Sequence, residues 1–247
     1  IGLGSGNLGT GLTTGTDNVA IGEASLDAVT SGSDNTAVGD NAAGAVTTGG
    51  NNVAIGSGAL LVATTAADNT ALGTDTLKAN SSGTDNTAVG YAAGDAVTTG
   101  ADNTLVGDNA GGAVSTGGNN TAVGSSALVA ATTSSGHTAV GSFALSTIST
   151  GTTGTAVGFE ALKVATGNNN SAVGYQAGVA VSTGTENTIV GNAAGDAVTT
   201  GADNTFVGDN AGGAVSTASG HTAVGSSALL TMSTGTTGTA IGFEALK

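Results

Sequence analysis

Hydrophobic and polar residues recur along this chain with a fixed period. An apolar residue, a branched aliphatic residue and a glycine form a tripeptide that is repeated 14 times. The motif glycines are Gly22, Gly39, Gly56, Gly73, Gly90, Gly107, Gly124, Gly141, Gly158, Gly174, Gly191, Gly208, Gly225 and Gly242. Successive glycines are 17 residues apart, except for the 16 residues from Gly158 to Gly174. A fixed period of this length is the sequence signature of a repeat architecture.

Each position of the repeat has its own residue type when the motif glycine is counted as zero. Position −1 is always Val, Ile or Leu, position −3 is mostly Thr, and position −4 is mostly Asn. The β-branched segment before each glycine, such as 36–38 or 87–89, predicts a short strand. Asp-Asn or Asn-Asn just before it predicts a tight turn, because Asn tolerates the left-handed region. The glycine after it allows a second corner.

These elements predict one coil of a solenoid: a strand, a glycine corner, a second short strand and a turn rich in Thr and Ser. Gly and Thr are poor helix formers, and 17 residues cannot hold two helices with their connections. We therefore expect an all-β fold, a parallel β-solenoid (β-roll or β-helix) of about 14 coils. Residues 1–21 form an irregular entry coil or cap in this interpretation, and the solenoid covers 22–247 and continues beyond both ends.

Strand alternation gives an expectation for the two faces of each coil. If position −1 points inward, position −3 does so too, and position −2 points outward. Position −2 is mostly Ala, but it holds Leu105, Ile189 and Phe206. An outward apolar row of this kind predicts a seam with another chain. Side-chain sizes at positions +4 and +7 also compensate for each other. Coils with a small residue at +4 have Val at +7, whereas the coil with Leu60 at +4 has Ala63 at +7. This compensation indicates that the two positions pack in the same interior space.

Composition narrows the range of functions. The chain has 45 glycines, only six aromatic residues and no Cys, so its core is narrow and holds no disulfide. The net charge is −14, with Lys78, Lys163 and Lys247 as the only cationic side chains. A nucleic-acid partner needs a basic surface, so none is expected. No apolar run approaches the roughly 18 residues of a membrane span, and no membrane insertion is expected.

Two segments carry a family resemblance. Residues 86–94 (NTAVGYAAG) and 170–178 (NSAVGYQAG) resemble the repeats of bacteriophage tail-fibre shafts. Residues 19–22 and 53–56 (VAIG) are similar to the head repeats of trimeric autotransporter adhesins. The second resemblance implies a parallel β-roll with three chains to a trimer. Both imply an extracellular or virion-surface location and a role in attachment.

Catalysis has little support in the sequence. His137 and His221 stand at position −4, where Asn stands in most copies, and each follows Ser-Gly. We interpret them as turn substitutes, since no Ser or acidic residue has a singular position beside them. We therefore expect no enzyme, no catalytic residue and no bound cofactor.

Two rows of side chains are candidates for binding. Asp68, Asp85 and Asp102 share position −5 in successive coils, about 5 Å apart, and calcium between them is the cation that such oxygen ligands favour. Four aromatic residues share position +1 and are candidates for contact with a ligand or partner, such as a cell-surface glycan or receptor: Tyr91, Phe159, Tyr175 and Phe243.

The functional expectation is a structural fibre segment of a phage tail fibre or an adhesin-like surface protein. Its main partner is another copy of the chain, in a homotrimer or end to end. A subunit of a self-assembling extracellular filament is the alternative. A third hypothesis is an ice-binding surface, suggested by the regular Thr residues. The predicted inward direction of position −3 counts against it.

Overall fold

The computed structural model describes residues 14–149, 153–230 and 237–247, and this part of the chain is all β. It contains 14 strands of three residues and no helix. The chain divides into two compact units, residues 1–120 and 121–247, which are described separately. The prediction of a parallel β-solenoid is confirmed. About 14 coils were expected, and the described residues contain 14 strands.

In the first unit the strands are β1 (Val19–Ile21), β2 (Thr36–Val38), β3 (Val53–Ile55), β4 (Thr70–Leu72), β5 (Thr87–Val89) and β6 (Thr104–Val106). In the second they are β7 (Thr121–Val123), β8 (Thr138–Val140), β9 (Thr155–Val157), β10 (Ser171–Val173), β11 (Thr188–Val190), β12 (Thr205–Val207), β13 (Thr222–Val224) and β14 (Thr239–Ile241). We call each strand, with the segment that follows it, the coil of the same number.

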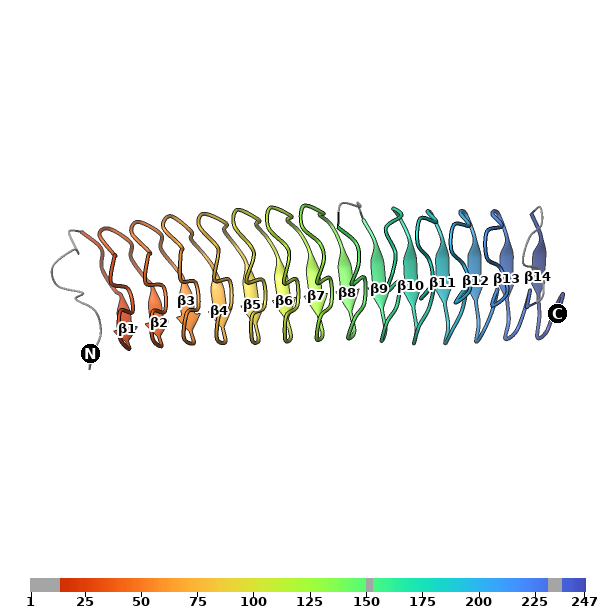
Figure 1. The fold of residues 1–247 in the computed structure, drawn as a ribbon, viewed down its shortest axis with the longest axis horizontal. Coiled ribbons are helices and arrows are strands. Elements are labelled where there is room, and N and C mark those ends of the chain that lie inside the picture. Colours follow the sequence, from red (N-terminus) through yellow and green to blue (C-terminus); the bar gives the residue numbers. More distant parts are fainter. Residues whose placement is uncertain (1–13, 150–152, 231–236) are drawn as a thin grey trace. The chain divides into compact units, whose positions relative to one another are not determined.

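Consecutive strands within each unit lie side by side in parallel (Figure 1). The register is the same throughout, so that Ala37 is paired with Ala20 on one side and Ala54 on the other. Parallel strands lie about 4.8 Å apart, so equivalent side chains form continuous rows. β1 already belongs to this stack, which therefore begins before residue 22. Residues 1–13 of the predicted cap lie outside the described residues.

The segment after the glycine corner differs from the prediction, because it contains no second strand in the described residues. Positions +2 and +4 adopt left-handed backbone angles instead, as in Asn41 (φ 56°) and Ala43 (φ 49°). Hydrogen bonds still join the coils here: Leu60 N–H donates to the carbonyl of Thr76 at 2.9 Å. Alternating handedness turns the chain too sharply for a strand but keeps its polar groups paired between coils.

The face assignment from the sequence was wrong. Position −2 is buried in every strand, and positions −3 and −1 are exposed or half-buried in every strand. Leu105, Ile189 and Phe206 are fully buried within this chain and cannot form the predicted seam. The expected alternation of inward and outward side chains was correct. The inward position is −2, the row of Ala, because the narrow coil has little room for larger side chains.

The large residues at position −2 fill space that glycines leave open at position +4. A Cβ on Gly195 or Gly212 would lie 2.9 or 2.7 Å from the Phe206 ring. Leu105 stands in the same way over Gly94 and Gly111. Each large side chain thus occupies the +4 site of its own coil and of the coil before. In most coils with Ala at position −2, as at Ala122, a buried Leu at +4 such as Leu128 fills the interior instead.

Position −4 forms a ladder of buried amides inside each unit. In the first unit, the Asn52 backbone N–H and Nδ2 both donate to Asn35 Oδ1, at 3.1 and 3.0 Å. Asn52 Nδ2 also donates to the Ala66 carbonyl at 2.9 Å. The same pattern repeats at Asn69, Asn86 and Asn103. Every rung is tied to its neighbours, so this polar row is stable in the interior.

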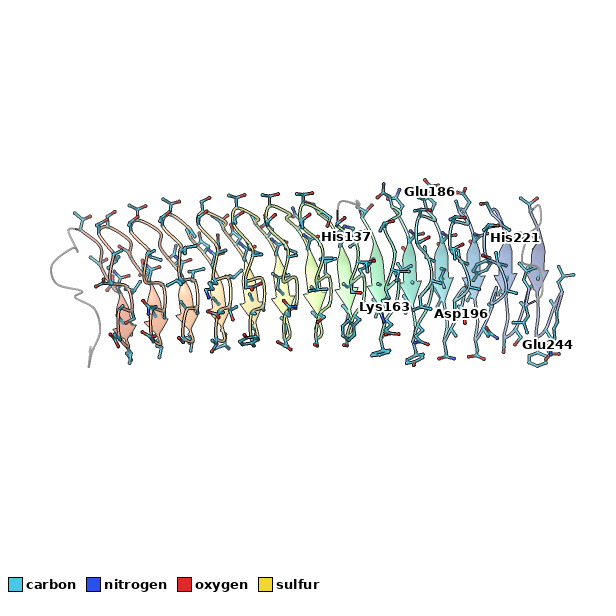
Figure 2. All side chains as sticks on the ribbon, viewed as in Figure 1. His137, Lys163, Glu186, Asp196, His221 and Glu244 are labelled. Carbon is cyan, nitrogen blue, oxygen red and sulfur yellow. The ribbon has the colours of Figure 1, made fainter. Side chains whose placement is uncertain are left out.

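His137 and His221 belong to the corresponding row of the second unit (Figure 2). The next residue in this row is Gly154 after His137 and Gly238 after His221. Their N–H groups donate to the two Nδ1 atoms at 3.0 and 2.9 Å. The imidazole therefore accepts the bond that Asn Oδ1 accepts elsewhere. The histidines are Asn substitutes, as predicted, but they lie in a buried ladder rather than in an exposed turn.

Candidate surface site on coils 8 to 10

No pocket is found over the described residues. The surface has three distinct regions: the outer face of the sheets, the acidic turn before each strand and the corner after each motif glycine. The last of these carries the side chains that depart most from the repeat.

The outer face of each sheet consists of two uncharged rows. Position −3 supplies Thr, Ser or Val, and position −1 supplies Val, Ile or Leu, in all 14 strands. We call this surface the Thr/aliphatic face. Among its members, Leu72, Val173 and Val190 are large apolar side chains with substantial exposure. The charged side chains of the chain all lie outside these rows.

Five of the six aromatic residues are exposed at the glycine corner. The four at position +1 that the sequence singled out (Tyr91, Phe159, Tyr175 and Phe243) are joined by one at position +2, Phe143. Sequence reasoning missed Phe143 because it falls one position later in the repeat. The sixth aromatic, Phe206, is buried. Tyr91 lies in the first unit, and the other exposed rings lie in the second.

Three exposed rings of the second unit lie in consecutive coils, 8, 9 and 10. The Phe159 and Tyr175 rings are stacked, with centroids 5.5 Å apart and planes 12° from parallel. Lys163 Nζ lies 5.7 Å from the centroid of the Phe143 ring. Cation–π contact and ring stacking each hold an exposed ring in place. We call Phe143, Phe159, Tyr175, Glu160, Lys163 and Gln176 the aromatic corner.

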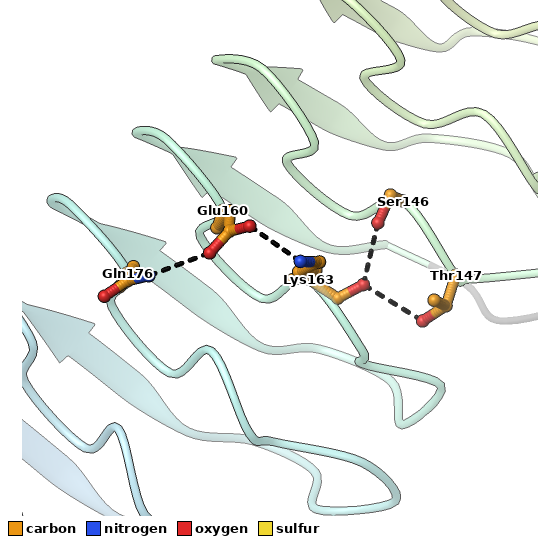
Figure 3. Close-up of polar contacts among 5 residues, drawn as sticks. All are labelled: Ser146, Thr147, Glu160, Lys163 and Gln176. Atoms are coloured by element: carbon orange, nitrogen blue, oxygen red, sulfur yellow. Dashed lines mark hydrogen bonds and ion pairs between the residues drawn. The ribbon is translucent and has the colours of Figure 1, made fainter.

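Polar side chains connect the same coils (Figure 3). Glu160 Oε1 accepts a bond from Lys163 Nζ at 2.6 Å, and Glu160 Oε2 accepts one from Gln176 Nε2 at 2.8 Å. The Lys163 carbonyl accepts bonds from the hydroxyls of Ser146 and Thr147, both at 3.1 Å. Coil 9, which supplies Glu160 and Lys163, is also the coil that is one residue shorter than the others.

Electrostatics favour the ionised form of the central carboxylate. The hydrogen bond from Lys163, followed by that from Gln176, lowers the pKa of Glu160 below its ordinary value. Elsewhere, desolvation raises the pKa of Asp95 and of Asp196 at position +5. Glu160 thus remains a charged acceptor at neutral pH, at the surface.

The acidic turns, which the sequence offered only as a candidate cation site, do not gather their carboxylates at one centre. Asp68, Asp85 and Asp102 occupy equivalent turns, with φ of 59°, 59° and 58°. Among the described residues, however, no group of three or more acidic, His or Cys side chains is placed to hold a metal ion. Asp68 Oδ1 accepts a bond from Asn51 Nδ2 at 3.1 Å, so the amide of a neighbouring coil is one of its partners. The turn directs these carboxylates into solvent instead of toward a shared centre.

These features define a class, the parallel β-solenoid repeat proteins, and this chain belongs to that class by its fold. Comparison with protein-family models, with curated proteins and with solved structures gave no match. In the described part of the chain, no helix is long and apolar enough to cross a membrane.

Proposed function

We propose that this chain is a structural shaft segment of a surface fibre, and that copies of it associate through the Thr/aliphatic face. One observation carries the proposal. The face repeats an exposed or half-buried Val, Ile or Leu in every coil and holds no charge, in a chain with a net charge of −14. Soluble monomers rarely expose continuous apolar rows of this extent, and a second copy offers a matching row at the same spacing.

The proposed assembly is a homotrimer, in which each sheet packs against the sheets of two partner chains. It replaces the seam expected at position −2 with positions −3 and −1. The resemblance to phage tail-fibre shafts and adhesin heads supports this assembly and an extracellular or virion-surface location. Within the stack, equivalent side chains repeat at a constant distance. Such a regular structure suits a spacer that presents a separate attachment tip. End-to-end association in a filament is the other arrangement that electron microscopy would distinguish, as continuous fibres.

A charge on the Thr/aliphatic face should dissociate the assembly. Val190→Glu places a carboxylate in the seam, where it loses its hydration and faces its own copies. Val164→Glu is a matched control, because both valines are 38% exposed and Val164 lies off the sheet. Light scattering after size-exclusion chromatography should give a trimer for the wild type and for Val164→Glu, and a smaller species for Val190→Glu. A monodisperse wild-type monomer would refute the shaft assembly.

Ice binding is a second candidate, favoured by the outward direction of the Thr row. The sequence argued against it because position −3 was expected to point inward, and that expectation was wrong. Hydroxyl and methyl groups now recur about every 4.8 Å along an open face. Thermal hysteresis tests this candidate. In solutions of the wild-type protein and of Val164→Lys, the freezing point of ice should lie below its melting point. Thr188→Lys should reduce this difference. No hysteresis from the wild type removes the candidate.

A further inference from the structure

The aromatic corner uses large apolar side chains in a way that the fold does not require. Most other coils have small or polar residues at position +1, such as Ser125 and Asn192, and form the same corner. Phe159 is 42% exposed and Tyr175 52% exposed, so neither ring is buried in the core. Exposed aromatic clusters on soluble proteins commonly mark contact surfaces.

Hydrogen-bonding groups stand beside the rings and are already ordered. Glu160 is held by Lys163 on one side and by Gln176 on the other, and the backbone of Lys163 is fixed by two hydroxyls of coil 8. A carboxylate, an ammonium and an amide together supply both donors and acceptors. Ordering them in advance lowers the entropy that a ligand must offset on binding.

This combination suits a carbohydrate better than a protein. A stable protein interface covers about 800 Å² on each partner. Three rings over three coils extend about 10 Å along the stack and have no pocket beside them. A pyranose ring matches such a small site, because its C–H face packs on an aromatic surface while its hydroxyls reach donors and acceptors at the edge. The acidic chain repels anionic sugars, so a neutral sugar fits best.

We propose that the aromatic corner binds a neutral oligosaccharide. One pyranose unit packs against the exposed surfaces of Phe159 and Tyr175, and its hydroxyls bond to Glu160, Lys163 and Gln176. This goes beyond the shaft role, because the site lies on one unit of one chain. It would therefore be present in a monomer, so that the sugar measurement and the mass measurement can fail independently.

Binding can be measured on the full chain with two probes, chitotriose and cellotriose, by isothermal titration calorimetry. For at least one of them we expect a dissociation constant on the order of 1 mM, as suits a shallow site. Tyr175→Ala should weaken binding about tenfold, and Glu160→Gln should weaken it severalfold. Tyr91→Ala is the matched control, an exposed ring at the same position in the other unit, and it should bind like the wild type.

A second readout uses tyrosine fluorescence, since Tyr91 and Tyr175 are the only tyrosines and the chain has no Trp. In the Tyr91→Phe variant, a saturable change in tyrosine fluorescence on adding sugar must come from Tyr175. The proposal is overturned if neither trisaccharide binds at tens of millimolar, or if Tyr91→Ala loses as much affinity as Tyr175→Ala. It is also overturned if Tyr175→Ala lowers the assembly mass while the wild type binds no sugar, which would make the corner a contact between chains.

Discussion

Phe206→Ala should destabilise the second unit by about 3–5 kcal/mol, the usual cost of removing a buried aromatic ring. The loss is expected at the upper end of that range, because glycines at two positions face the ring. Gly195 and Gly212 supply no side chain that could move into the vacated space. Denaturant unfolding followed by circular dichroism measures the change. Amide hydrogen exchange should locate it in coils 11 and 12, since a repeat stack responds to local changes.

The double variant Phe206→Ala with Gly212→Leu tests the reason for that loss. Coil 13 already has this combination, with Ala223 at position −2 and Leu229 at +4. Leu229 has a φ of 58°, close to the 67° of Gly212, so the repeat accommodates Leu in this backbone conformation. We expect the double variant to recover at least half of the lost stability. Gly212→Leu alone should destabilise, because its side chain would collide with the ring. Additive losses in the double variant would contradict complementary filling of the core.

Asn86→Asp should have a comparably large effect in the first unit. The substitution removes the Nδ2 donor that bonds to Asn69 Oδ1 and to the Gly100 carbonyl. It also brings a carboxylate against those two acceptors in the interior. Each buried polar group left unpaired costs about 1–3 kcal/mol, and the charge adds to this. We therefore expect at least ~3 kcal/mol of destabilisation at pH 7, measured by denaturant unfolding.

Asn119→Asp is the matched control for this prediction. Asn119 stands at position −5, where it is exposed, and Asp68, Asp85 and Asp102 show that Asp is accepted at the equivalent place. Its change in unfolding free energy should stay within about 0.5 kcal/mol. Equal effects of the two substitutions would show that the ladder does not determine stability. Lowering the pH should partly restore Asn86→Asp, since protonation removes its charge and supplies one donor.

The period of the sequence was sufficient to predict the coil, the parallel strands and the left-handed turn before each strand. It could not determine which face of a three-residue strand points inward. Rows such as Ala37 and Ala54 are ambiguous, because Ala suits both a crowded interior and a flat contact surface. The signal that resolves the question was present in the sequence: every large residue at position −2 comes with Gly at +4, in its own coil and in the coil before. That pattern requires the two positions to meet.

The candidate site was predictable only in part. The shared position of Phe159 and Tyr175 indicated neighbouring rings, because equivalent residues of stacked coils lie side by side. Phe143 and the bond of Glu160 to Gln176 could not be inferred, because they depend on how side chains of neighbouring coils meet. The ion pair of Glu160 with Lys163 lies within one coil, and the same pair recurs as Asp75 with Lys78 and as Glu244 with Lys247. The row of Asp68, Asp85 and Asp102 shows the opposite case. These residues share one position of the repeat, but their carboxylates do not gather at one centre.

The packing of large residues against glycines at two positions has a consequence for how such a chain can grow. When a stretch of sequence is duplicated, the copy has a complete core only if it includes both glycines that face its large residue. Residues 92–116 and 193–217 are identical except at one position, where Leu105 corresponds to Phe206. The first segment includes Gly94 and Gly111, and the second includes Gly195 and Gly212. The heritable building block of this stack is therefore longer than its 17-residue period.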